Sequence, residues 1–296
     1  MKKRLLPILA LVLSLTLIVG VLFSVANNHL KVAKEKKVMA GFETLMAREA
    51  LSVAEVINYL DQYINTVSKE NASKLLLGLE RVQQAELTKW QKRYEDSVLQ
   101  EKITRVYQDK WSRDEIEEIA DEDLKRVLLE TADNGFKVET AEGFYFPVID
   151  YTFYEKYYSV VTPDLVAYLE LMAVESEQTP VKDAALIIGW DEILNRAERQ
   201  EEFIREYSSS TQVEPVQELL KRYVSFALFG CNNTPLFSYD TKQMRPEAKR
   251  AYEEHVWKEE KGNFSALINE YLSVLKENDY RLTAEVDAFR KKAVFP

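Results

Sequence analysis

The chain begins with a long uncharged segment directly behind a cluster of positive charge. Lys2, Lys3 and Arg4 precede the 22 residues from Leu5 to Ala26, which carry no charge and are mostly apolar. As an α-helix this segment would extend roughly 33 Å, close to the hydrocarbon thickness of a bilayer. Helices buried in a protein core rarely carry such a run behind a basic triplet. The pattern therefore predicts that residues 5–26 contact the lipid bilayer.

Two interpretations of this segment remain open. A retained anchor needs about 20 apolar residues, and the run has them. A cleaved signal peptide needs small residues before the cut, which Ser24-Val25-Ala26 would supply. Lysines also follow the run, so both flanks are basic. We expect a single-pass protein of the cell membrane with its N-terminus inside and its bulk extracytoplasmic, or a protein secreted after cleavage near Ala26.

Charge separates this leader from the rest of the chain. Residues 1–37 hold seven Lys or Arg and one Glu, a net charge of +6. Of the 39 basic and 49 acidic residues in the chain, 32 and 48 remain in residues 38–296, a net charge of −16. Such a surface repels the phosphates of nucleic acid. Nucleic-acid partners are therefore not expected.

Residue counts exclude several kinds of site. Two His and one Cys cannot build zinc fingers, disulfide scaffolds or iron–sulfur clusters. Only 8 Gly and 8 Pro argue against β-rich folds and glycine-rich phosphate loops. The acidic cluster from Asp114 to Asp123 lacks the pattern of a calcium loop, and Ser112 with Glu115 indicates a helix capping box instead. We expect no metal and no cofactor.

The predicted fold is all-α. An apolar seam at alternating spacings of four and three is formed by Met46, Ala50, Val53, Ile57, Leu60, Ile64 and Val67. With a second helical segment near 73–108 it predicts an antiparallel helical hairpin over 38–110. The seam could serve as a packing platform or support self-association through 46–67. Residues 1–37 then form the membrane anchor or signal peptide with its basic flank.

Residues 111–296 are predicted to form a C-terminal helical domain. Near 134–149 the helical spacing of apolar residues is interrupted. There Asn134-Gly135 and two short aromatic and β-branched runs predict a β-hairpin. Proline and glycine signals then predict a multi-helix array. Its helices are expected near 151–160, 163–177, 180–207, 214–229, 246–261, 264–278 and 283–293.

An aromatic stretch is the first candidate binding site. Eight Phe and Tyr residues fall between 144 and 158, and Asp150 lies among them. Tyrosine rings suit stacking on sugars or peptide side chains, and a carboxylate can bind a hydroxyl or an amine. The candidate binding residues are Asp150, Tyr151, Tyr154 and Tyr158. The alternative is that the rings join the hairpin to the next helix, with Asp150 as its N-cap.

A polar loop is the second candidate. Asn232, Asn233 and Thr234 lie between two apolar stretches and can present directed hydrogen bonds, although the same residues form ordinary turns. Cys231 and His255 could pair as nucleophile and base, but a thiolate after a helix C-terminus is disfavoured by the helix dipole. His255 and Glu259 make at most half of a metal site.

One segment carries a catalytic alternative. The residues Leu171-Met172-Ala173-Val174-Glu175-Ser176, with Pro180 four residues further on, are similar to the catalytic-acid segment of lytic transglycosylases. That resemblance implies that Glu175 acts as the general acid on a glycosidic bond. The similarity covers about ten residues. The family's Gly-Leu-Met-Gln is replaced by Ile188-Gly189-Trp190-Asp191, and its Ala-Tyr-Asn-Ala-Gly segment is missing.

No complete catalytic constellation is visible in the sequence. We therefore expect a helical binding or scaffold protein of the cell envelope, rather than an enzyme, that recognises a peptide, a glycan or another envelope protein. The alternative is a cell-wall glycan-cleaving enzyme that uses Glu175.

Overall fold

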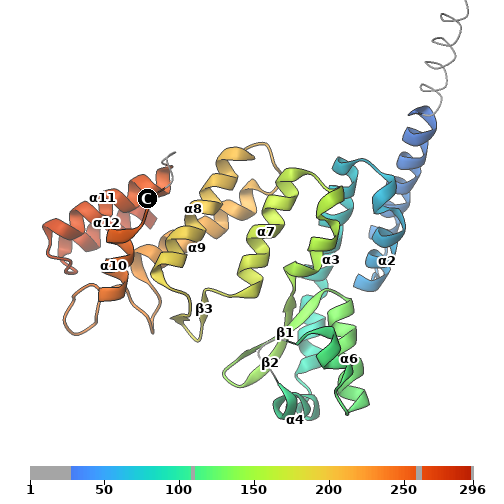
Figure 1. Ribbon diagram of the computed structural model, residues 1–296, viewed down its shortest axis with the longest axis horizontal. Helices are drawn as coiled ribbons and strands as arrows, with labels where there is room; N and C mark the ends of the chain where they lie inside the picture. Colours follow the sequence, from blue (N-terminus) through green and yellow to red (C-terminus); the bar gives the residue numbers. More distant parts are fainter. Residues whose placement is uncertain (1–27, 108–110, 258–261, 295–296) are drawn as a thin grey trace, which may run out of the picture. The chain divides into compact units, whose positions relative to one another are not determined.

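The structure, a computed structural model, describes residues 28–107, 111–257 and 262–294, and these are mostly helical (Figure 1). The chain forms two compact units and passes from unit 1 to unit 2 between Val82 and Gln83, inside α3 (Lys69–Tyr94). No described helix is both long and apolar enough to span a membrane. The segment predicted to contact the bilayer, residues 5–26, lies outside the described residues.

Unit 1 contains a helix over residues 28–46, α2 (Val53–Tyr63), the 3-10 helix η2 (Ile64–Thr66) and the first part of α3. The predicted seam is therefore not one helix, because the chain turns between Met46 and α2. Ser52 causes the break: its hydroxyl accepts a hydrogen bond from the Glu55 N–H, and the Glu55 carboxylate accepts one from the Ser52 N–H. This capping box starts α2 as a separate helix.

Side chains on three segments hold unit 1 together. The Glu35 carboxylate accepts hydrogen bonds of 2.7 Å from the Ser68 N–H and from the Asn71 side chain, so it ties helix 28–46 to the start of α3. The Tyr59 hydroxyl of α2 donates to the Val38 carbonyl at 2.7 Å. Burial of apolar side chains completes the core, which includes the seam residues Val53, Ile57, Leu60 and Ile64.

Self-association through 46–67 stays a prediction. Because these four side chains pack inside unit 1, a dimer through this segment would have to use its exposed residues, such as Ala50.

Unit 2 begins with the rest of α3, followed by α4 (Ser97–Val106), α5 (Arg113–Glu117) and α6 (Glu122–Asp133). The second predicted arm, 73–108, is interrupted where the Asp96 carboxylate caps α4 by accepting from the Leu99 N–H at 2.9 Å. The prediction of two uninterrupted helical arms is therefore wrong, although both segments are helical. The capping box of Ser112 and Glu115 is confirmed at the start of α5.

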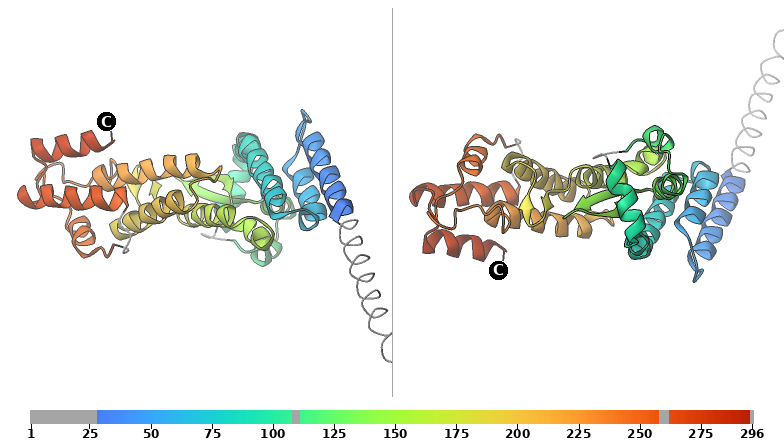
Figure 2. Two further views of the ribbon diagram at one scale, coloured as in Figure 1. Left: turned by 90° about the horizontal axis from the view of Figure 1, so that it is seen from above. Right: turned by 90° about the horizontal axis from the view of Figure 1, so that it is seen from below.

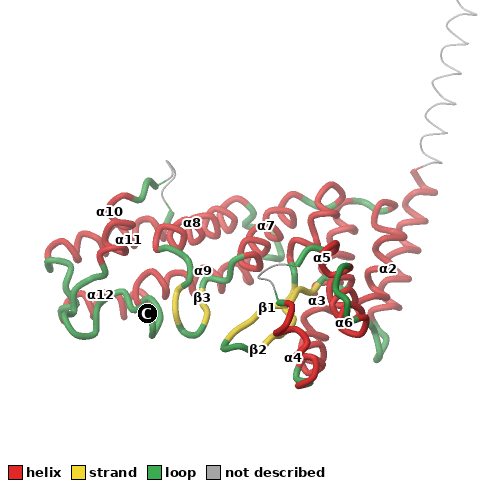
Figure 3. Tube along the Cα trace, turned by 60° about the horizontal axis from the view of Figure 1, so that its bottom comes forward, coloured by secondary structure: helices red, strands yellow, loops and turns green. Residues whose placement is uncertain are grey.

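The predicted β-hairpin is confirmed. Strands β1 (Phe136–Ala141) and β2 (Phe144–Ile149) form a two-stranded antiparallel sheet (Figure 3). Glu142 and Gly143 make the turn with φ values of 50° and 77°. This left-handed pair matches the twist of a two-residue hairpin, and glycine adopts it without strain.

The remaining elements are mostly helical, as predicted: the 3-10 helix η3 (Tyr151–Val160), α7 (Pro163–Glu177), α8 (Trp190–Glu206), α9 (Val213–Phe229), α10 (Pro246–Glu254), α11 (Asn263–Glu277) and α12 (Ala284–Val294). Within unit 2, α8 and α9 pack along each other, and α10, α11 and α12 pack against them (Figure 2). Buried residues of these five helices form one apolar core.

The predicted helix 180–207 is wrong in its first third. A second small hairpin, β3 (Val181–Lys182) with β4 (Ala185–Leu186), occupies that segment. Its turn residues Asp183 and Ala184 have φ values of 48° and 56°. A distant loop holds the turn, because Asn233 donates from its side chain to the Asp183 carbonyl at 2.6 Å and from its N–H to the Ala184 carbonyl at 2.9 Å.

The helix predicted near 246–261 is shorter in the structure, because α10 ends at Glu254, and Gly262 is the N-cap of α11.

Candidate functional site

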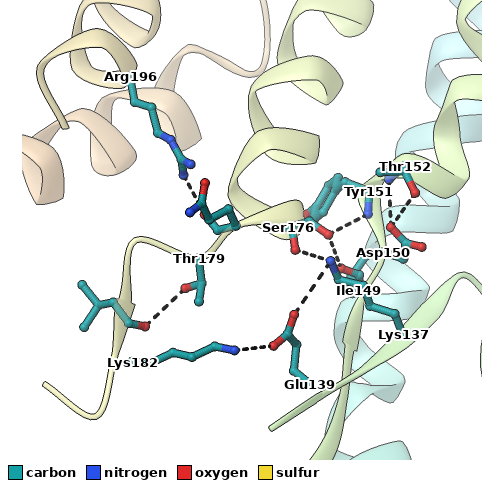
Figure 4. A network of polar contacts seen from close by, with 12 residues as sticks. Lys137, Glu139, Ile149, Asp150, Tyr151, Thr152, Ser176, Thr179, Lys182 and Arg196 are labelled. Carbon is teal, nitrogen blue, oxygen red and sulfur yellow. Dashed lines mark hydrogen bonds and ion pairs between the residues drawn. The ribbon is translucent and has the colours of Figure 1, made fainter. Parts of the chain in front are cut away.

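Asp150 joins the β-hairpin to η3 (Figure 4). Its N–H donates to the Gly135 carbonyl at 3.0 Å. Its carboxylate oxygen Oδ1 accepts from the Thr152 N–H at 3.1 Å and from the Thr152 hydroxyl at 2.7 Å. Asp150 is thus the N-cap of η3, and the same carboxylate lines a pocket beside the hairpin.

The aromatic stretch is largely a packing element. The rings of Tyr151 and Tyr154 are buried and stacked, with 5.6 Å between their centroids. The Tyr154 hydroxyl donates to the side-chain oxygen of Gln83, whose amide nitrogen donates to the Asn134 carbonyl at 2.8 Å. Only Tyr158 of the three predicted tyrosines is partly exposed. These contacts match the alternative in which the rings join hairpin and helix.

The Tyr158 hydroxyl is buried and has no hydrogen-bond partner among the described residues. Burial raises the pKa of Tyr158 to about 12, and the nearby carboxylates of Glu155 and Glu170 act in the same direction. The hydroxyl therefore stays protonated at neutral pH.

A cavity of about 170 Å³ lies between α6 and the β-hairpin, and we call it the hairpin pocket. Its apolar wall includes Trp111 and Phe136. Its polar groups are Thr131, Lys137, Glu139, Asp150, Thr152 and Glu177. The pocket thus combines aromatic and aliphatic surface with three carboxylates and one ammonium.

Ion pairs and hydrogen bonds hold two lining residues of the hairpin pocket, Lys137 and Glu139 (Figure 4). The Lys137 ammonium of β1 donates to the Ser176 carbonyl near the end of α7 and lies 3.9 Å from Glu139. Lys182 of β3 reaches the same Glu139 carboxylate at 2.9 Å. The Ser176 hydroxyl donates to the Ile149 carbonyl at 3.2 Å. Charged side chains of both hairpins and polar groups of Ser176 in α7 therefore hold these residues in one geometry.

Glu175 lies in a buried polar cluster between α7, α8 and α9. Its carboxylate accepts from the Tyr223 hydroxyl at 2.5 Å and lies 3.4 Å from the Arg196 guanidinium. Arg196 also donates to the Glu192 carboxylate and to the Gln178 carbonyl, each at 2.8 Å. Burial raises the pKa of Glu175, although Tyr223 and Arg196 act against it. Glu175 is thus half-buried, and its carboxylate is held by two fixed partners.

Of the three predicted residues in the polar loop, two make structural hydrogen bonds and one lines a cavity. Asn233 holds the β3–β4 turn, as described above. The Thr234 N–H donates to the Cys231 carbonyl at 3.0 Å within the loop. Asn232 lines a second cavity of about 220 Å³, the loop pocket, between the end of α9 and α12.

Cys231 and His255 have separate surroundings. Cys231 lines the loop pocket, and burial raises the pKa of its thiol, which disfavours the nucleophilic thiolate. His255 lies beside Glu198 of α8 at 3.8 Å and against the ring of Trp257. Glu259, its predicted companion for a metal, is outside the described residues. The described residues contain no group of three or more His, Cys, Asp or Glu that could hold a metal ion.

Sequence reasoning missed most of the hairpin pocket. Lys137 and Glu139 are two positions apart on β1, so their side chains lie on the same face of the strand. Once the strand was predicted, this spacing indicated that the two residues lie together. Trp111 and Glu177 come from segments far apart in sequence, and no local pattern relates them.

The chain has no significant match among protein-family models, curated proteins or solved structures.

Proposed function

We propose that the chain is a binding protein of the cell envelope that takes one cationic side chain or amino group of a peptide partner into the hairpin pocket. The leader from Leu5 to Ala26 would anchor the protein in the membrane, or export it before cleavage near Ala26. The remaining chain, acidic overall, would then be extracytoplasmic.

The observation that carries the proposal is the lining of the hairpin pocket. Glu139, Asp150 and Glu177 line it together with one ammonium, that of Lys137, and the apolar surface of Trp111. Lys182, which does not line the pocket, pairs with Glu139, so three carboxylates stand against two ammonium groups. An amino group gains from the excess of carboxylates, and the alkyl part of a lysine side chain gains from the apolar wall. A neutral glycan offers no charge to these carboxylates, so the pocket favours a peptide.

The small size of the hairpin pocket indicates that only part of a larger partner would enter it. Sites for small molecules usually measure about 300–1,000 Å³, whereas this cavity measures about 170 Å³. It has room for a single side chain, so most of the partner would lie on the surrounding surface.

Binding of two capped amino acids to the full chain in detergent tests the pocket. We expect N-acetyl-lysine methylamide to give saturation-transfer NMR signals and the norleucine compound, which has the same four side-chain carbons but no ammonium group, to give none. Asp150→Asn keeps an N-cap residue but removes the charge, and it should weaken binding by about tenfold, or about 1.4 kcal/mol. Glu170→Gln, which lines a separate groove, should have no effect. Equal binding of norleucine, or an unchanged affinity in Asp150→Asn, would contradict the proposal.

The proposed location has its own test. Cys231 is the only cysteine of the chain, so labelling by a membrane-impermeant maleimide reports its side of the membrane. We expect labelling in intact spheroplasts that produce the protein. Labelling only after lysis would contradict an extracytoplasmic location.

A second candidate function rests on Glu175. Burial and a raised pKa are the properties that a general acid requires, and they support a glycan-cleaving enzyme. Incubation of the full chain with peptidoglycan, comparing wild type with Glu175→Gln, tests it. Turnover that is lost in the variant supports the enzyme, whereas no turnover in either protein removes it.

A further inference from the structure

The loop pocket differs in charge from four other pockets in the described part of this acidic protein. The linings of four other pockets formed by the described residues each include at least one Asp or Glu. The loop pocket is lined by Lys242 and Arg290 and, among the described residues, by no carboxylate. Two cations without an acidic neighbour in the wall create a local positive potential.

Arg290 is held rigidly in the wall of the loop pocket. Its guanidinium lies over the ring of Phe229, 4.5 Å from the centroid, and 5.6 Å from that of Phe237. Its Nε and Nη2 atoms donate to a single oxygen of Asp287, at 2.9 Å and 2.7 Å. Asp287 is also paired with Lys291 at 2.5 Å, so one carboxylate is shared by two cations and the group stays positive.

The second cation, Lys242, stands on a fixed backbone. Its N–H donates to the Ser238 carbonyl at 3.0 Å, and its own carbonyl accepts from the Leu282 N–H at 2.8 Å. Its φ of 58° lies in the left-handed region, which these hydrogen bonds maintain. At the rim, the Tyr239 hydroxyl donates to the Asn232 carbonyl at 3.0 Å. A ligand would therefore meet a cation whose backbone position is already set.

We propose that the loop pocket binds an organic oxyanion, a carboxylate or a phosphate, attached to an apolar body. Lys242 and Arg290 would hold the charged oxygens, with the Ser238 hydroxyl and the Asn232 side chain able to donate further hydrogen bonds. The rings of Phe229 and Phe237 would contact the apolar body. This site is separate from the hairpin pocket and takes a ligand of opposite charge.

Cys231 supplies a specific reporter, because the chain's only thiol lines the loop pocket. The test compares its modification rate in the full chain by two methanethiosulfonate reagents, the anionic sulfonatoethyl and the cationic trimethylammonioethyl compound. The ratio of the two rates cancels any change in the thiol pKa. We expect the rate of the anionic reagent divided by that of the cationic reagent to lie well above the value for a free thiol. This ratio should fall roughly tenfold in Lys242→Gln and in Arg290→Gln.

Matched variants distinguish the pocket charge from general effects. Lys221→Gln changes the net charge equally but lines a different pocket, so its ratio should match wild type. Arg290→Lys keeps the charge and should keep the ratio even if it lowers the melting temperature. A wild-type ratio equal to that of a free thiol, or equal ratios in all variants, would overturn the proposal.

Protection of Cys231 identifies the ligand group. Phenylacetate or phenyl phosphate should slow its reaction with neutral iodoacetamide, and the more effective compound identifies carboxylate or phosphate as the preferred group. Phenylacetamide, which lacks the charge, should not protect. Inorganic phosphate should protect less than phenyl phosphate, since it lacks the apolar body. Protection by phenylacetamide, or by none of the anions, would contradict the assignment.

Discussion

The hydroxyl of Tyr223 donates a 2.5 Å hydrogen bond to the carboxylate of Glu175, which joins α9 to the end of α7 inside unit 2. Arg196 of α8 lies against both groups, 3.4 Å from the carboxylate and 3.3 Å from the hydroxyl. Three helices therefore meet at one half-buried acid. This arrangement stabilises the fold whether or not Glu175 has a catalytic role.

Removing the donor should cost measurable stability. Tyr223→Phe keeps the ring and deletes the hydroxyl, so the buried carboxylate of Glu175 loses a partner. We expect the free energy of unfolding to fall by about 1–3 kcal/mol, measured by urea denaturation. The loss of unfolding free energy in the double variant Tyr223→Phe, Glu175→Gln should differ from the sum of the losses in the two single variants. Strict additivity would show that the two side chains do not interact.

His255 should make stability depend on pH. Burial lowers its pKa below 6.5, while Glu198 and Asp191 partly oppose the shift. A histidine with a lowered folded-state pKa takes up its proton more readily when unfolded, so stability falls as the pH drops below 6.5 toward the folded-state pKa. The free energy of unfolding should fall less between pH 7.5 and pH 5.5 in His255→Gln than in the wild type. An equal loss in both proteins would contradict this account.

The small size of Gly78 is required where α3 meets helix 28–46 in unit 1. A Cβ atom at this position would lie 2.5 Å from the ring carbon Cζ of Phe42, whose side chain is buried in the core. Gly78→Ala should therefore destabilise by about 1–3 kcal/mol, despite the better helix propensity of alanine. Phe42→Leu should relieve the clash, so thermal melts of the double variant should recover part of the loss.

Gln83 is a buried polar link that a hydrophobic residue cannot replace. Its side-chain nitrogen donates to the carbonyls of Asn134 and Gly135, and its oxygen accepts from Tyr154. Gln83→Leu removes the side-chain donor to the Asn134 carbonyl, and it removes one partner each from the Gly135 carbonyl and the Tyr154 hydroxyl. It should cost about 3 kcal/mol. Adding Tyr154→Phe removes the hydroxyl that Gln83 accepts from, so calorimetry should then find a destabilisation smaller than the sum of the two single effects. A Gln83→Leu protein as stable as wild type would contradict this role.

The sequence determined those features that depend on residues a few positions apart. Ser112 and Glu115 start α5, Pro163 starts α7, and the turn at Gly143 closes the β-hairpin, because capping and turn geometry act within one turn of chain. The candidate Asp150 was also found locally, since its position between strand and helix is visible in the pattern. The alternative role offered for it, the N-cap of η3, is present in the structure, whereas its role in binding stays a prediction.

Only the tertiary structure decided which candidate side chains meet. The turn at Asp183 replaces a predicted helix because Asn233, 50 residues away, bonds to it. Lys137 reaches Ser176 across 39 residues, and the loop pocket joins Lys242 to Arg290. Such contacts depend on how helices pack, and packing energy is summed over many weak, non-local contacts that no short sequence pattern records.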